Sequence, residues 1–298
     1  MFFVHLINLN IMLYRVIFIT LIFTLISCND EPYGSTNTEN SDLDGNDPVN
    51  EFNPINGYWK YNVVGSSEDV PEMNFLASDS VYVSEIFQDS FKISVNDDGI
   101  ANGTMNMILS SGNLYSTPTS LSLDGIINIP EDLSSIELLN NITLTGLKIF
   151  DLSVENGDIM FFQEDSFSNS IELEETEIPI DLSYEIQTKK NNFHNSINLN
   201  GISYNNVFEG NLAFSISVNA TFSLFGFSQT VAIFEPQDII SINYYYAESI
   251  GLVRAESYQG YEISTGLTQL SNLTGFTIDF PTNLEIEVIE ELNEFIVE

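Results

Sequence analysis

The sequence predicts an all-β protein, in which antiparallel sheets form one or two barrel, half-barrel or sandwich domains after a disordered tether. From Ile55 onward, short apolar runs alternate with polar residues, which is typical of strands that bury one face. Gly, Asn-Gly, Asp-Gly or Pro interrupts these runs about every ten residues. No long stretch has convincing helical spacing, and the closest segments, 134–139 and 289–296, are short enough to be strand or loop.

Residues 1–27 have the composition of a signal peptide. Arg15 supplies a short charged region, and the apolar run 16–26 that follows it has the length of a cleaved signal rather than of a membrane span. A start at Met12 is sufficient for this signal. A start at Met1 lengthens the apolar run enough to cross a bilayer, so an uncleaved anchor is the alternative.

Cys28 is the only cysteine of the chain and ends the segment Leu25-Ile26-Ser27-Cys28. This segment resembles the bacterial lipobox, which implies cleavage before Cys28 and a lipid on its thiol. The following Asn29-Asp30-Glu31 resembles the export signal of Bacteroidetes-type surface lipoproteins. That resemblance implies anchoring in the outer membrane of a Gram-negative bacterium, at the periplasmic face or the cell surface. A thiol consumed by lipid leaves none for a disulfide, so the fold must depend on its apolar core.

Residues 28–53 form a polar, acidic segment with few apolar side chains, which predicts a disordered tether. Its expected reach is about 25–30 Å. Part of it matches the spacing of an EF-hand calcium loop through Asn40, Asp42, Asp44, Gly45 and Glu51. In a segment this rich in Asp, Asn and Gly, a chance match is the better interpretation. We therefore expect no cofactor, with calcium at these residues as the alternative.

The charge balance is strongly acidic, with 43 Asp and Glu against 7 Lys and Arg and a net charge of −36. Such a chain repels nucleic acid, because phosphate backbones bind to clustered cations. The only adjacent basic pair of the mature chain, Lys189-Lys190, is followed by Asn rather than by aromatic residues. The sequence thus predicts no nucleic-acid partner.

The first strand is predicted from the alternation of Trp59, Tyr61 and Val63. Two hairpins are predicted, one turning at 96–99 after strand 91–95 and one turning at Asn156-Gly157 between 150–154 and 159–162. Later strands are expected at 214–218, 221–225, 239–246, 251–256 and 284–288.

A polar, acidic interval at 163–177 suggests a boundary between two β domains, 54–165 and 166–298. Gly57-Tyr58-Trp59, followed by Asn96-Asp97-Asp98-Gly99, resembles bacterial lipocalin-like domains, which implies a small antiparallel barrel. The segments 201–207 and 244–254 are similar to exported β proteins with a curved sheet like that of lipoprotein carriers. This second resemblance implies an open barrel or half-barrel with an apolar concave face.

Catalytic and zinc signatures are absent from the sequence. His194 is the only histidine after the signal peptide, and its Asn-rich context predicts a solvent-facing loop residue. A glycan-cleaving hydrolase remains an alternative, because it needs only two carboxylates in a cleft, one of them with a raised pKa.

Three residues are candidates for ligand binding, Arg254, Tyr244 and Tyr246. Arg254 is the only arginine after the signal peptide and could clamp a carboxylate or stack on a tyrosine, although an exposed strand residue that pairs with one of the many acids is the better interpretation. Since neighbouring strand residues point to opposite faces, Tyr244 and Tyr246 can share a surface that Tyr245 does not.

From these observations we expect a lipid-anchored, non-enzymatic binding or interaction module. Its partners would be the membrane, through the lipid on Cys28, together with an envelope protein, a glycan or a hydrophobic ligand. The alternatives are a carrier of a lipid-like molecule, with a dry cavity lined by phenylalanine and tyrosine, and the glycan hydrolase.

Overall fold

The computed structural model describes residues 57–68, 70–127, 142–173, 176–224, 227–274 and 281–297. The described residues belong to one compact unit, Pro48–Glu298. Cys28, the predicted tether with its calcium pattern, and the segment 134–139 lie outside the described residues. The predictions made for them stay predictions.

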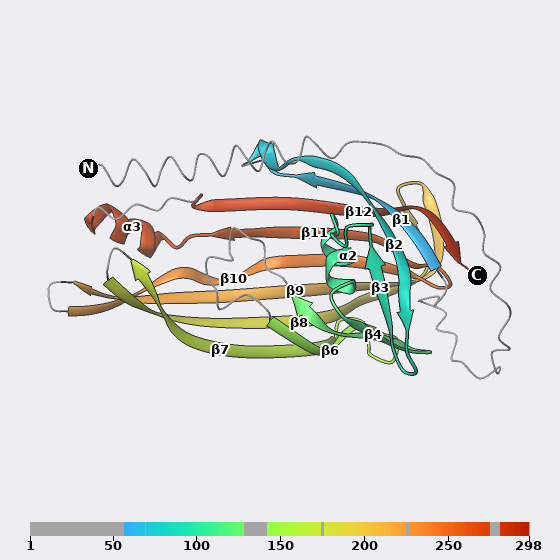
Figure 1. The fold of residues 1–298 in the computed structure, drawn as a ribbon, viewed down its shortest axis with the longest axis horizontal. Helices are drawn as coiled ribbons and strands as arrows, with labels where there is room; N and C mark the ends of the chain where they lie inside the picture. Colours follow the sequence, from blue (N-terminus) through green and yellow to red (C-terminus); the bar gives the residue numbers. More distant parts are fainter. Residues whose placement is uncertain are drawn as a thin grey trace. The chain divides into compact units, whose positions relative to one another are not determined.

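Twelve strands form one antiparallel sheet in the order β6-β5-β4-β3-β2-β1-β12-β11-β10-β9-β8-β7 (Figure 1). The strands are β1 Gly57–Ser66, β2 Phe75–Ile86, β3 Phe91–Val95, β4 Asn113–Thr117, β5 Ser120–Ile127, β6 Ile142–Asp151, β7 Ile159–Leu173, β8 Thr176–Leu199, β9 Ile202–Leu224, β10 Phe227–Ala247, β11 Gly251–Glu262 and β12 Asn283–Val297. The predicted all-β class is confirmed, and of the alternatives left open the chain adopts a single sheet.

The sheet curls until its two edge strands, β6 and β7, approach each other. Side chains from the β7 side reach the backbone carbonyls of β6: Gln163 donates to Thr143 at 3.2 Å and Thr188 donates to Lys148 at 2.6 Å. No β6–β7 ladder is formed among the described strands. The result is a nearly closed barrel whose seam is held by side chains.

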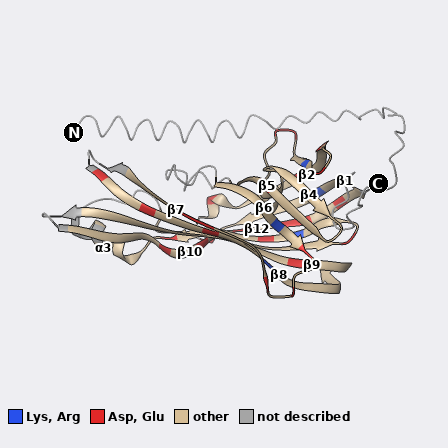
Figure 2. Ribbon diagram, turned by 90° about the horizontal axis from the view of Figure 1, so that it is seen from below, with Lys and Arg blue, Asp and Glu red and all other residues tan. Residues whose placement is uncertain are grey.

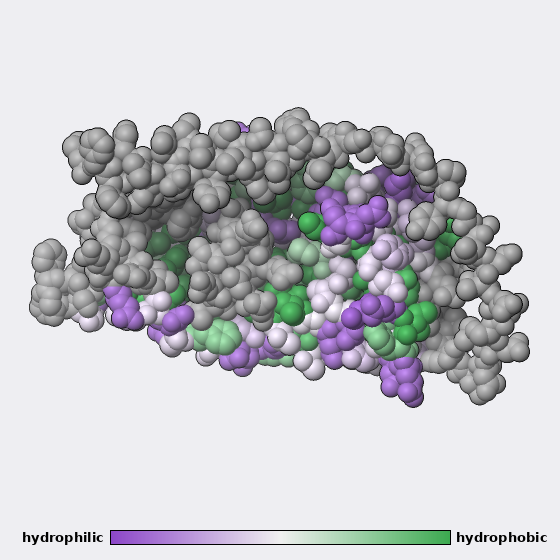
Figure 3. Space-filling view, viewed as in Figure 1, coloured by the Kyte–Doolittle hydropathy of each residue, from purple (hydrophilic) through white to green (hydrophobic). Residues whose placement is uncertain are grey.

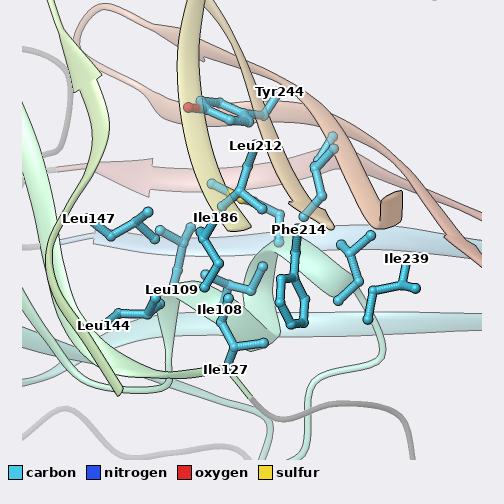
Figure 4. Close-up of a cluster of buried hydrophobic side chains, with 14 of the residues drawn as sticks. Ile108, Leu109, Ile127, Leu144, Leu147, Ile186, Leu212, Phe214, Ile239 and Tyr244 are labelled. Carbon is cyan, nitrogen blue, oxygen red and sulfur yellow. The ribbon is translucent and has the colours of Figure 1, made fainter. Parts of the chain in front are cut away.

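Within the described residues, three short helices accompany the sheet, η1 Pro71–Met73, α2 Thr104–Leu109 and α3 Thr265–Thr274. Helix α2 lies inside the barrel, where Ile108 and Leu109 pack among side chains of β6, β8 and β9 such as Leu147 (Figure 4). Ile108, Leu109 and Met105 are all buried. A six-residue helix buried on nearly all sides has no polar face, so its sequence carries no amphipathic signal.

Several predicted elements are confirmed. Trp59, Tyr61 and Val63 alternate on β1 and are all buried. A tight hairpin that the sequence analysis did not predict joins β8 and β9 through Asn200 and Gly201, both with positive φ, 48° and 87°. This is the turn geometry that Asn-Gly favours in a tight hairpin. The segment 289–296 lies within strand β12.

Both hairpins predicted in the first half are wrong. After β3, the residues 96–99 do turn with positive φ at Asn96 and Gly99, but the chain then enters α2 instead of a paired strand. After β6, the turn at Gly157 leads to β7, which pairs with β8 at the opposite edge of the sheet. In each case the local residues predicted the turn correctly. The pairing of the strands, however, depends on contacts with strands that are distant in the sequence.

The later strands are longer than predicted. The segment predicted at 214–218 and the described part of the one predicted at 221–225 belong to one strand, β9, which ends at Leu224, because Asn219 and Ala220 continue its pairing with β10 and β8. The domain boundary predicted after residue 165 falls within strand β7, and described strands on both sides of it are part of the same sheet.

Candidate functional site

Two acidic side chains, Asp79 and Glu290, are wholly buried inside the barrel, each with 0% exposure. Asp79 lies on β2 and Glu290 on β12, the two neighbours of β1. Their cross-strand partners on β1 are Tyr61 and Val63, whose side chains also face the interior. Buried carboxylates are costly unless they are hydrogen-bonded, so their partners identify what they do.

Glu290 binds the first turn of α2. The backbone N–H groups of Met105 and Asn106 donate to its two carboxylate oxygens, at 2.6 and 3.1 Å. Burial raises the pKa of Glu290 to about 8, in spite of these two hydrogen bonds, and the negative charge of Asp79 acts in the same direction. Glu290 is therefore predominantly protonated at neutral pH.

Asp79 binds the loop that precedes α2. Its Oδ1 accepts from the Asn96 side chain at 2.9 Å and from the Asn102 backbone at 2.9 Å, and its Oδ2 accepts from the Gly103 backbone at 2.8 Å. Burial works to raise the pKa of Asp79, but the hydrogen bonds from Asn102, Gly103 and Asn96 together lower it. The two neighbouring carboxyls thus have opposite pKa shifts, and the ionised one fixes the loop 96–103.

The outer side of this loop forms one wall of a groove of about 590 Å³. The floor consists of outward-facing residues of β1 and β2, where Tyr58 pairs directly with Tyr82 in the ladder. The lining residues are Tyr58, Ser78, Ser80, Tyr82, Asn96, Asp97, Asp98, Ile100 and Asn102. We call this site the loop groove. Because Asp79 holds the wall from behind, the groove is largely formed before any ligand arrives.

The composition of the loop groove restricts its ligands. Two tyrosine rings offer apolar faces with polar tips, and serine, asparagine and aspartate offer both donors and acceptors. Its charged lining residues are Asp97 and Asp98, so an anionic ligand would be repelled. This combination suits a neutral molecule with many hydroxyl groups.

A second groove, of about 520 Å³, lies on the outer face of β7 to β10. Three of its four serines are bonded within the sheet through their hydroxyl groups: the Ser183 and Ser217 oxygens lie 2.8 Å apart, and Ser215 donates to Asp238. Glu164 and Glu185 line it as well. Figure 2 shows that acidic residues are spread along these long strands rather than gathered at one point. The aromatic residue that lines the second groove, Tyr184, is only 7% exposed, whereas Tyr82 in the loop groove is 39% exposed.

The three ligand-binding candidates lie away from the loop groove. The Arg254 side chain, 12% exposed, binds Glu256 at 2.7 Å and Glu291 at 3.3 Å. Tyr244 and Tyr246 are buried on the interior face, and Tyr244 donates to the Ile149 carbonyl at 2.6 Å. Interior rings contact one another here, as Phe150 and Tyr246 do at 5.6 Å between centroids. These rings pack as core.

His194 is not the loop residue that its context predicted. It lies on strand β8, and its Nε2 is 2.6 Å from Glu209 Oε2 on β9. The run Asn191-Asn192 does not break the strand, because a bulge between Lys190 and Asn192 absorbs it. Among the described residues, no group of three or more His, Cys, Asp or Glu side chains is placed to hold a metal ion.

Sequence reasoning missed Asp79 and Glu290, although both leave a trace in the pattern. Asp79 takes an inward position of β2, in step with Val81, and Glu290 takes an inward position of β12, between Val288 and Leu292. An acid in step with the apolar face of a strand is the signal that could have identified them.

The chain matches no family model, no curated protein and no solved structure in comparisons with known proteins. Within the part of the chain that the structure describes, no helix combines the length and apolar character needed to cross a membrane.

Proposed function

We propose that the protein is a non-enzymatic binding module, held at the outer membrane by a lipid on Cys28, and that its loop groove binds a neutral oligosaccharide. The observation that carries this proposal is the pairing of Tyr58 with Tyr82 beside a polar loop that Asp79 holds in place. Sugar rings present apolar C–H faces that stack on aromatic rings, while their hydroxyl groups bond to side chains such as Asp98 and Asn102.

Preorganisation supports a binding role. A loop that is already ordered loses little conformational freedom when a ligand binds, so more of the contact energy becomes affinity. Asp79 accepts hydrogen bonds from Asn96, Asn102 and Gly103, which spans the whole loop wall.

The two alternatives lack a specific observation in their favour. A hydrolase needs its carboxylate pair open to substrate, whereas Asp79 and Glu290 are completely buried and bound to backbone N–H groups. A lipid carrier needs a dry cavity, but inward-facing rings such as Phe208 and Tyr244 stack on each other. We therefore favour the groove over the interior.

The test is glycan-array binding of the full chain, purified from membranes in mild detergent. Tyr82→Ala removes one stacking ring and should weaken binding about tenfold, equal to ~1.4 kcal/mol. Phe162→Ala is the matched control, because Phe162 is 48% exposed against 39% for Tyr82 and lies on β7, outside the groove. Absence of any bound glycan, or equal losses in both variants, would refute the proposal.

The lipid anchor has its own test. Cys28→Ala should move the protein from the membrane fraction to the soluble fraction, and intact mass measurement of the unsubstituted chain should show added acyl groups. Retention of the Cys28→Ala variant in the membrane would favour the uncleaved apolar anchor. Protease treatment of whole cells then distinguishes the cell surface from the periplasmic face.

A further inference from the structure

Exposed apolar side chains gather at one end of the sheet. The antiparallel order places four features at this end: the start of β1, the end of β12, the β2–β3 turn and the β8–β9 turn. In Figure 1 this end lies on the right, where the C-terminus is marked. The exposed side chains there are Ile86, Phe87, Ile202, Phe295 and Ile296. We call this set the apolar end.

The exposure of these side chains is substantial and comes from separate elements. Ile86 is 59% exposed on the β2–β3 side, Ile202 is 50% exposed beside the β8–β9 turn, and Ile296 is 57% exposed on β12. Over the strands β1 to β4, Figure 3 shows hydrophobic atoms beside hydrophilic ones. Leaving such side chains in water costs about 25 cal/mol per Å² of apolar surface, so a gathering of them indicates a partner.

The chain itself indicates which partner. Strand β1 begins at Gly57, at the apolar end, and the 56 residues before it contain the apolar run 16–26 and Cys28. A lipid on Cys28 would therefore be connected to the sheet at this end rather than at the opposite one. The nearest large apolar partner of the apolar end would then be the bilayer that holds the lipid.

We propose that the apolar end rests on the lipid surface, with Phe87 and Ile202 inserted among the headgroups. This proposal rests on the lipid anchor of the proposed function. Acidic side chains also lie at this end, Glu85 and Asp89 beside the β2–β3 turn and Glu294 on β12. They would be repelled by anionic lipids, so the surface that fits is a zwitterionic phospholipid.

The experiment measures contact of single positions with lipid. The full, acylated chain is reconstituted in phosphatidylcholine vesicles that contain a lipid-borne nitroxide quencher. Since the acyl group occupies the only native thiol, an introduced cysteine is the only site for a fluorescent label. Labels at Phe87→Cys and Ile202→Cys should lose fluorescence, whereas a label at Leu76→Cys, at the opposite end of β2, should not.

Each outcome has a distinct meaning. Quenching at Phe87 and Ile202 but not at Leu76 supports the proposed orientation. Equal quenching at all three positions, or none at Phe87 and Ile202, overturns the orientation and leaves the lipid anchor standing. Uptake of label by the unsubstituted chain shows a free Cys28 thiol, which overturns the anchor and this proposal with it.

Discussion

Asp79 and Glu290 bind consecutive parts of one segment: Asp79 accepts from the Gly103 backbone, and Glu290 accepts from the Met105 backbone two residues later. The carboxyls come from β2 and β12, on opposite sides of β1, and the segment they hold joins the loop groove to the interior helix α2. Stability of the barrel and shape of the groove therefore depend on the same two side chains.

The protonation of Glu290 predicts a dependence of stability on pH. Its pKa rises from 4.5 in a free side chain to about 8 in the folded protein, so folding binds a proton that the unfolded chain releases. The stabilisation is complete below about pH 4.5 and is lost as the pH rises toward 8. The loss is on the order of 5 kcal/mol.

Glu290→Gln isolates this effect, because it removes the titrating group and keeps the size of the side chain. Urea unfolding of the full chain in detergent is measured from pH 5 to pH 8.5 through the fluorescence of Trp59, the only tryptophan. The free energy of unfolding of the unsubstituted chain should fall, relative to that of the variant, as the pH rises. Parallel pH profiles of the two proteins would contradict the raised pKa.

Asp79→Asn should destabilise the protein and weaken the loop groove together. Asparagine replaces one acceptor oxygen by a donor, which would oppose the N–H groups of Asn102 or Gly103. Loss of a buried charged hydrogen bond costs about 3 kcal/mol. Because the pKa of Asp79 is lowered on folding, the stability difference between the two proteins should shrink as the pH falls below about 4.

The matched control is Asp97→Asn, which changes an exposed acid of the same loop. Urea unfolding should place this variant within about 0.5 kcal/mol of the unsubstituted chain. Equal stabilities of the Asp79 and Asp97 variants would show that Asp79 does not hold the loop.

The sequence predicted the strands of this fold better than their partners. Alternation identified β1 through Trp59, Tyr61 and Val63, because the two-residue period of a half-buried strand can be recognised in a short stretch of sequence. The turn at 96–99 was recognised from Asp98-Gly99, but its continuation into α2 depends on Asp79, some twenty residues earlier, and on Glu290 near the opposite end of the chain. Local pattern does not contain such distant contacts.

Because local pattern does not contain distant contacts, the sequence also did not identify the residues of the loop groove as a site. Arg254, Tyr244 and Tyr246 were selected for their residue types, yet burial and pairing with acids give all three a packing partner. Tyr58 and Tyr82 become a pair only through the register of β1 against β2, which the sequence does not state. Long-range register, more than residue type, decides which side chains share a surface.

Gly103→Ala should be far more destabilising than a typical glycine substitution. A Cβ at this position would lie 2.1 Å from Glu290 Oε2, and the carboxyl has no free space because it bonds to Met105 and Asn106. Either the helix shifts or two buried hydrogen bonds break, at a cost of about 3 kcal/mol or more.

Gly99→Ala is the comparison for this prediction. Gly99 has a φ of +76° and no atom within 4 Å of an added Cβ, so only backbone strain of about 1 kcal/mol is expected. Thermal unfolding should rank Gly103→Ala well below Gly99→Ala. The reverse order would mean that the Glu290 side chain can move aside.

Lys190 provides a test of how the seam between β6 and β7 is held. It is buried on β8, with 6% exposure, and its Nζ donates to the backbone carbonyls of Leu152 and Val154 at 3.2 and 2.7 Å. These carbonyls belong to the connection between the two edge strands, where no ladder partner is available to them in the described sheet. A charged donor on two partly buried carbonyls contributes about 1.5 kcal/mol.

Lys190→Met keeps the approximate length of the side chain and removes the donor. It should therefore lower the free energy of unfolding by the contribution of these two hydrogen bonds. Lys189→Met is the matched control, because Lys189 is the exposed neighbour on the same strand and loses the same charge. In hydrogen exchange of the full chain, the amides of 152–158 should exchange faster in Lys190→Met alone. Equal exchange in both variants would mean that the connection is held by its own turn, through the bond from the Gly157 N–H to the Lys190 carbonyl at 2.6 Å, and not by the lysine side chain.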